Sequence, residues 1–441
     1  MLTHLTLRNF RAFKAQQFNF SRINVLVGPN NSGKSSVLSA INLLAQTAID
    51  NDANVPLVLR GRFDDLGTFH DVVHGNNPNT PLSLEFGIGE YAYHIDFKYR
   101  SQRREIEITR HSISNKKTQI FEYALRKKET YELRYGNNSV EELLPGSVKR
   151  RPEFMGLTVV DRGLNIIYEP QRSKEISEDT KKVVQRIRQD MNAAQRELRM
   201  AFAFFDSLSP FRDAPTRTFL FSGAVPGRVG RTGSNAIDIL VSDNFRRGSE
   251  KYGLIEGVSR WLSSTSIAKA IKVKALTSRH YEICVVGYDN KDHNLCDVGF
   301  GCSQVLPVLI GSLNMMSGKQ TQSDPIFVVE EPEIHLHPNA QAELGTFLVD
   351  LFKKSGQVFI ETHSANLIIR LQRHVAKGDL APADLRIFYV SGGTVPPPVV
   401  IMEVDEKGFF KHDWPGGFFP QRQEESLALA QAAAQKEKRS D

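Results

Sequence analysis

The stretch INVLVGPNNSGKSS, residues Ile23–Ser36, decides the fold of this chain. Its first five residues, Ile23–Val27, are mostly apolar and predict a buried strand. A turn rich in glycine follows, and from about Lys34 to Ala48 apolar residues recur at helical spacing. Strand, glycine-rich turn and helix, in this order, form the context that a phosphate-binding loop needs.

The turn reads GPNNSGKSS and satisfies the pattern G-x-x-x-x-G-K-[ST]. Backbone N–H groups of such a loop and of the helix N-terminus favour a phosphate, because they are unpaired and the helix dipole is positive there. We expect Lys34 to reach the β- and γ-phosphate oxygens of ATP and Ser35 to offer its hydroxyl to Mg²⁺. The predicted nucleotide-binding residues here are Gly28, Pro29, Asn30, Asn31, Ser32, Gly33, Lys34, Ser35 and Ser36.

A second motif, IFVVEEPE at Ile326–Glu333, predicts a buried strand that ends in adjacent carboxylates. This is a Walker B arrangement, and adjacent carboxylates at a strand tip repel each other unless a cation is near. We expect Glu330 to hold Mg²⁺ through water, so that Ser35 and Glu330 are the predicted metal residues. Glu331 is the predicted general base for the attacking water.

A third motif, ETHS at Glu361–Ser364, follows the mostly apolar strand Gln357–Ile360. A histidine at the tip of the strand after Walker B can contact the γ-phosphate or the attacking water. We therefore count His363 with Glu331 and Lys34 as the predicted catalytic residues.

A fourth motif, DVGFGCSQ at Asp297–Gln304, precedes an apolar helix expected from about Val305 to Met316. Glycines before a helix N-terminus form a second anion site. The predicted nucleotide contacts in this segment are Gly299, Gly301, Ser303 and Gln304.

The order of these four motifs resembles the ABC-type ATPase heads of SMC and RecF proteins, and it is closest to bacterial ATPases of the OLD (overcoming lysogenisation defect) group. VGFGCSQVLPVL is similar to their signature, and EEPEIHLHP to their Walker B and D-loop, with Ile334–Pro338 as the D-loop. The resemblance implies an α/β fold: a P-loop NTPase head of the ABC type with a β-rich subdomain and a short helical insertion. It also implies ATP and Mg²⁺ as cofactors, and a homodimer or higher homo-oligomer whose heads sandwich ATP.

The chain departs from these relatives in three places. The signature lacks a literal LSGGQ, and when aligned on Gln304 it places Gly301 where ABC proteins have a serine, with Ser303 as the alternative phosphate contact. The insertion has no sustained heptads, so we expect no long coiled-coil arms. Residues 364–441 hold no D-x-D pair, so we expect no Toprim nuclease domain.

The motifs predict four regions along the chain. Residues 1–170 form the N-terminal half of the head with the P-loop and a β-rich subdomain, and residues 171–250 a helical insertion with an Arg/Gly/Pro-rich segment. Residues 251–395 form the C-terminal half with signature, Walker B and histidine loop, and residues 396–441 a small tail domain. Residues 173–206 predict one helix or a short hairpin, and residues 207–248 look like a loop.

Composition narrows the class of protein without identifying its role. The net charge of +6 permits nucleic-acid binding but does not demand it. We expect no membrane partner, because no run approaches a membrane span and the N-terminus has no apolar signal core. Three cysteines, an odd and sparse number, favour a reducing cytoplasm.

Two classes of function stay open at this point. One is an ATPase whose ATP-dependent dimerisation switches a DNA-related or anti-phage defence activity. The other is a nucleotide-gated sensor or scaffold that holds a separately encoded effector, such as a nuclease or toxin, and binds no DNA itself. A transporter ATPase is a weaker third candidate, because it predicts a regular LSGGQ and a membrane partner.

Overall fold

A computed structural model gives the structure of the protein. It describes residues 1–49, 55–115, 118–126, 130–136, 138–140, 152–169, 174, 176–317, 324–393 and 398–415. Residues 416–441 of the predicted tail domain lie outside the described residues.

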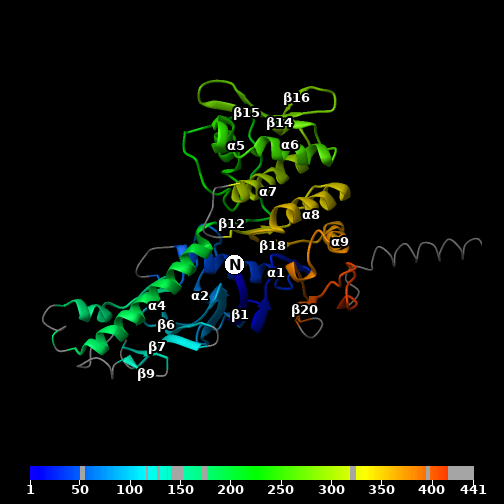
Figure 1. Cartoon of the computed structure of the whole chain (residues 1–441). Coiled ribbons are helices and arrows are strands. Elements are labelled where there is room, and N and C mark those ends of the chain that lie inside the picture. The colour runs from blue at the N-terminus through cyan, green and yellow to red at the C-terminus, as the bar shows by residue number, and fades with distance from the viewer. Residues whose placement is uncertain are drawn as a thin grey trace, which may run out of the picture.

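A six-stranded, mostly parallel sheet forms the centre of the molecule (Figure 1). Its strands lie in the order β12-β17-β18-β3-β19-β20, and only β20 runs antiparallel to its neighbour. The bounds are β12 Phe205–Leu208, β17 Ile326–Glu330, β18 Gln357–Glu361, β3 Ile23–Val27, β19 Leu385–Val390 and β20 Val399–Met402. All residues of β3 are buried, as the apolar stretch predicts.

The two faces of this sheet pack against two separate hydrophobic cores, because successive side chains of a strand point to opposite faces. In β3, Val25 and Val27 belong to one core and Leu26 to the other. The first core includes α7 (Phe300–Ser317), α8 (Pro338–Phe352) and α9 (Ala365–Ala376), which follow the signature, Walker B and histidine motifs. Such a sheet, covered on both faces, carries its functional groups at the carboxyl ends of its strands.

The other core lies under an eight-stranded antiparallel sheet, ordered β2-β1-β4-β5-β6-β7-β8-β9. Its strands are β1 Leu2–Phe10, β2 Phe13–Asn19, β4 Leu82–Ile88, β5 Tyr91–Arg100, β6 Glu105–Asn115, β7 Thr118–Leu125, β8 Tyr131–Tyr135 and β9 Asn138–Ser139. A small hairpin of β10 (Glu153–Met155) and β11 (Thr158–Val160) follows in sequence. The short helix α2 (Phe69–Val72) precedes β4, and α1 (Lys34–Ile49) contributes its apolar residues to this core.

Helix α4 (Glu178–Ala203) lies within residues 173–206, where one helix or a short hairpin is predicted, and it forms one continuous helix (Figure 1). Ser177 caps its N-terminus by accepting a hydrogen bond from the Thr180 N–H. Its buried residues recur every three or four positions and face the antiparallel sheet and α1, which places them in the core: Val184, Ile187, Met191, Ala194 and Leu198.

A third region stands at the opposite end of the molecule from α4 (Figure 1). It contains α5 (Ala236–Phe245), α6 (Leu254–Ser264) and a small sheet of β13 (Phe219–Leu220), β14 (Ala270–Ala275), β15 (His280–Val286) and β16 (Asp292–Asn294). Strands β14 and β15 form an antiparallel hairpin.

The structure differs from the loop prediction for residues 207–248, because α5 lies within them. Glycine, proline and arginine are frequent in this stretch, so its composition does not predict the helix. Elements of the central sheet also cross two expected region boundaries: β12 lies within the predicted insertion, and β20 lies beyond residue 396. The sheet therefore joins segments that the sequence pattern separates.

Within the described residues, α7 is the one helix long and apolar enough to span a membrane by length and composition. It is 67% buried inside the protein and lies in the core against α5 and α6. The free cysteines Cys284 and Cys302 are buried, and Cys296 is half-buried.

Candidate active site

The P-loop joins β3 to α1, and two of its glycines are required by close approach of other atoms. Gly28 has a φ of 146°, and a Cβ there would lie 2.1 Å from the carbonyl oxygen of Val390 on β19. Gly33 has a φ of 107°, and a Cβ there would lie 2.8 Å from the methyl group of Ala12. The loop is thus held between β19 and the β1–β2 turn, in a shape that only glycine allows at these positions.

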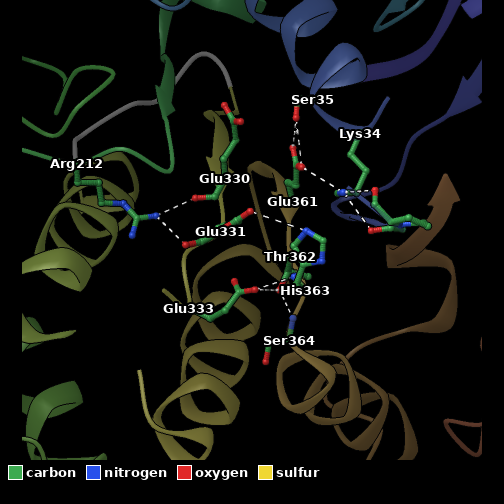
Figure 2. A network of polar contacts seen from close by, with 12 residues as sticks. Lys34, Ser35, Arg212, Glu330, Glu331, Glu333, Glu361, Thr362, His363 and Ser364 are labelled. Atoms are coloured by element: carbon green, nitrogen blue, oxygen red, sulfur yellow. Dashed lines mark hydrogen bonds and ion pairs between the residues drawn. The ribbon is translucent and has the colours of Figure 1, made fainter. Parts of the chain in front are cut away.

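Lys34 and Ser35 open α1 and turn toward the sheet (Figure 2). The Lys34 ammonium is buried and donates to the carbonyl oxygens of Gly28 at 3.1 Å and Pro29 at 2.9 Å. It also lies 3.7 Å from a carboxylate oxygen of Glu361. Burial lowers the pKa of Lys34 although Glu361 opposes the shift. The Ser35 hydroxyl donates to the same carboxylate, at 3.1 and 3.3 Å from its two oxygens.

Two carboxylates stand side by side at the ends of neighbouring strands. Glu330 ends β17, Glu361 ends β18, and the two residues are partners in the parallel register. Their side chains extend to the same side of the sheet (Figure 2). Burial, together with the smaller effects of the Glu361 and Asp64 charges, raises the pKa of Glu330 to about 8. Burial also raises the pKa of Glu361. This concentration of buried negative charge is what a cation would relieve.

Glu331, the residue after β17, leaves the strand in a left-handed conformation with a φ of 42°. Its N–H donates to the carbonyl oxygen of Glu361 at 2.7 Å, which fixes this turn. One of its carboxylate oxygens lies 3.9 Å from Nε2 of His363 (Figure 2). Burial and the nearby Lys34 charge lower the pKa of His363. The structure thus brings the predicted base and the predicted histidine together from adjacent strands.

A buried carboxylate behind this pair holds the histidine loop in place. One oxygen of Glu333 accepts from the Thr362 hydroxyl at 2.6 Å and from the His363 N–H at 2.8 Å. Burial raises the pKa of Glu333. Ser364 caps α9 by accepting from the Leu367 N–H. The backbone of His363 is therefore held between the Walker B loop and the start of a helix.

Arg212 connects the signature helix to the Walker B loop, and Figure 2 shows its two contacts with that loop. Its guanidinium donates to the carbonyl oxygen of Gln304 at 3.2 Å, of Glu330 at 2.8 Å and of Glu331 at 3.1 Å. Arg212 is only 9% exposed, and burial lowers its pKa to about 10. A planar guanidinium suits this position, because its donors point in several directions at once.

The signature segment begins α7 earlier than expected, at Phe300 rather than near Val305. A Cβ on Gly301 would lie 2.5 Å from the carbonyl oxygen of His335, so this glycine allows α7 to pack on the D-loop. The Ser303 hydroxyl is buried and donates to the Phe300 carbonyl oxygen at 2.9 Å. Gln304 is buried, whereas a Cβ on Gly299 would meet open space. The contacts of this segment run to Arg212 and the D-loop, and its phosphate contacts stay a prediction.

A family model described as "AAA ATPase domain" matches residues 1–137 and 95–368 of the chain. This covers the P-loop, the signature, both carboxylates of Walker B and His363. The chain belongs to the AAA ATPase domain family. The predicted α/β ATPase fold agrees with this match and with the P-loop and central sheet described above.

Three solved structures are similar to this AAA ATPase at low identity. The SMC head domain from Thermotoga maritima is 13% identical, with a TM-score of 0.33, over 92% of this chain and 99% of that chain. An SmcHead bound to the C-winged helix domain of ScpA is 11% identical, with a TM-score of 0.41, over 92% of this chain and 98% of that one. An Smc head domain with an extended coiled coil, bound to the C-terminal domain of ScpA derived from Pyrococcus furiosus, is 12% identical, with a TM-score of 0.38, over 91% and 96%.

The donors around Ser35 fit a Mg²⁺ ion. They are oxygen ligands only: the Ser35 hydroxyl and the carboxylates of Glu330 and Glu361. Mg²⁺ is usually held by one or two carboxylates together with the phosphates of a nucleotide. In the described ranges, no group of three or more His, Cys, Asp or Glu is placed to hold a metal ion.

Two residues of the site are not among the catalytic, nucleotide-binding or metal residues that the sequence motifs of this AAA ATPase predict. Glu361 is the first residue of the ETHS motif. Its position at the end of a strand is the signal that could have identified it as a site residue. Arg212 lies in a loop-like segment, where no local pattern separates it from the exposed Arg217, which is paired with Asp297. Asp64 is a further neighbour, since it accepts from Ser39 and pairs with Arg231 at 2.8 Å.

Proposed function

We propose that this AAA ATPase hydrolyses ATP slowly, at a site that a second copy of the chain completes, and that ATP-dependent pairing of two copies switches a DNA-related or anti-phage defence activity. The P-loop residues Gly28–Ser36 hold the phosphates, and Ser35 and Glu330 are the proposed Mg²⁺ residues. The proposed kinship to OLD-type ATPases rests on the motifs VGFGCSQVLPVL and EEPEIHLHP. A cytoplasmic location is part of the same proposal.

The Glu331–His363 pair carries the hydrolytic part of the proposal. Both side chains are about one third exposed and lie at the carboxyl ends of β17 and β18. Strand β18 is adjacent to the P-loop strand β3, and β17 is the next strand beyond it. In the proposed reaction a water oxygen attacks the γ-phosphorus while the bond to the β–γ bridging oxygen breaks. Glu331 takes the proton of the water, His363 contacts the γ-phosphate, and ADP leaves. Bound Mg²⁺ would neutralise part of the phosphate charge.

The exposed block formed by the start of α7 and the D-loop supports a composite site. Phe300 is 60% exposed, and its ring lies 5.7 Å from that of His335. Beside it, Gly299 is exposed just before α7, and a helix N-terminus favours an anion. In the proposal this block, with Gly299, Gly301, Ser303 and Gln304, covers the γ-phosphate bound by the other copy.

Glu331→Gln tests the proposal, because it removes the base and keeps the size of the side chain. We expect phosphate release to fall by a factor of about 100 or more, while ATP binding remains. Light scattering of the same variant should give the mass of a dimer with MgATP and a smaller mass without it. Asp350→Asn, at the exposed end of α8, is the matched control for loss of one charge.

Two results would contradict the proposal separately. Hydrolysis at the parental rate by Glu331→Gln would remove Glu331 as the base. A mass that does not change with ATP would remove the ATP-dependent dimer. Salt-sensitive binding of DNA, measured by fluorescence anisotropy with and without ATP, separates a DNA-associated ATPase from a scaffold for a separate effector.

A further inference from the structure

Glu361 occupies a position that the P-loop chemistry does not require. Strand β18 lies directly beside β3, and Glu361 is paired in register with Leu26, two residues before Gly28. Its carboxylate accepts both hydrogen-bond contacts of the Ser35 hydroxyl and lies 3.7 Å from the Lys34 ammonium (Figure 2). The side chain is only 7% exposed, so water screens these contacts poorly.

Lys34 and Ser35 are the two side chains that a P-loop offers to a nucleotide and its cation. Here one carboxylate contacts both of them. A triphosphate that reaches Lys34 must therefore approach the negative charge of Glu361, and Glu330 stands beside it in the strand register. Without a cation, like charges a few ångströms apart oppose each other. At an effective dielectric constant of about 20, one such pair near 5 Å corresponds to an affinity change on the order of 100-fold.

We propose that Glu361 makes ATP binding by this chain dependent on a divalent cation. Before binding, the carboxylate holds Lys34 and Ser35. It disfavours the binding of free ATP. It favours the binding of ATP in complex with a divalent cation, because Glu361 and Ser35 both face the position of this cation. The species that binds is thus the metal–nucleotide complex rather than ATP followed by metal. This inference rests on the proposed function at the same site, and it adds which form of the nucleotide is selected.

The test is equilibrium binding of ATP to the purified full chain, by titration calorimetry, once with excess Mg²⁺ and once with EDTA. The parental chain should bind on the order of 100-fold more weakly in EDTA. Glu361→Gln keeps a polar side chain of the same size without the charge. In EDTA this variant should bind ATP at least 10-fold more tightly than the parental chain does. Its ATP affinities in Mg²⁺ and in EDTA should therefore differ by no more than about 10-fold.

Two controls separate this effect from the loss of any negative charge. Asp350→Asn removes a distant exposed carboxylate and should keep the parental ratio of the ATP affinity in Mg²⁺ to the ATP affinity in EDTA. Glu403→Gln is the same type of change at an exposed carboxylate that pairs with Lys411, and it should keep this ratio too. Circular dichroism checks that each variant is folded. Should Glu361→Gln fail to fold, Glu361→Ser removes the same charge and has the same expected result.

The possible failures are distinguishable. A parental chain that binds ATP equally well in Mg²⁺ and in EDTA overturns this inference alone. A neutral Glu361 variant that keeps the parental ratio does the same. A parental chain that binds ATP in neither condition overturns the proposed function, and this inference falls with it.

Discussion

Replacing Arg212 by methionine should destabilise the protein by about 3 kcal/mol. The guanidinium makes three hydrogen bonds to main-chain carbonyl oxygens, and bonds from a charged donor are each worth about 2 kcal/mol. Against them stands the cost of burying the charge. Burial lowers the pKa of Arg212 from 12.5 to about 10, which corresponds to about 3 kcal/mol. The difference of roughly 3 kcal/mol is lost in the variant, since methionine fills the space but donates nothing.

The assay is urea unfolding followed by circular dichroism, with the free energy of unfolding compared between variants. Arg217→Met is the matched control, because Arg217 lies in the same segment and its side chain is 67% exposed in its pair with Asp297. An exposed pair is worth about 1 kcal/mol or less, so this control should change stability little. Arg212→Lys should not restore the parental value, because an ammonium cannot span carbonyls of both the signature helix and the Walker B loop.

Two outcomes would refute this reasoning. If Arg212→Met unfolds within 1 kcal/mol of the parental chain, the three hydrogen bonds do not outweigh the cost of burial. If Arg217→Met is equally destabilised, the loss reflects the segment as a whole and not the buried contacts of Arg212.

Two further predictions concern the P-loop and the antiparallel sheet. Gly28→Ala would place a Cβ 2.1 Å from the Val390 carbonyl oxygen at a φ of 146°, so we expect a loss of about 3 kcal/mol or more in urea unfolding and no ATP binding in calorimetry; parental affinity would contradict this. His111 is buried, with its ring nitrogen 2.9 Å from the Leu157 carbonyl oxygen, and burial lowers its pKa from 6.5 to about 4. Because the folded state binds this proton less well, the stability from His111 is complete above pH 6.5 and is lost as the pH falls toward 4, by up to about 3 kcal/mol. Unfolding at pH 7, 5 and 4 should show a smaller pH dependence for His111→Gln, and an unchanged slope would rule out His111 as its source.

Local patterns predicted the elements whose shape depends on neighbouring residues in the chain. The strand Ile23–Val27, the glycine turn and helix α1 follow one another, and the structure confirms all three. Strands β17 and β18 also lie where their apolar runs indicate. By contrast, β12 is a four-residue strand that is held by pairing with β17, more than a hundred residues later, so no local pattern identifies it.

The features of the site also divide into those that the local sequence predicts and those that depend on the tertiary structure. The sequence alone determined that the chain carries a P-loop, adjacent carboxylates after a buried strand, and a histidine after the next strand, because each feature is a short run with its own chemistry. The tertiary structure decided which of them meet. Strand β18 lies between β17 and β3, so Ser35 contacts Glu361, and Glu330 stands one strand farther away. Arg212 reaches Gln304 and Glu331 only because the loop after β12 folds over both. Strand order and long-range contacts depend on how whole elements pack their buried faces, and that information is spread over the entire chain.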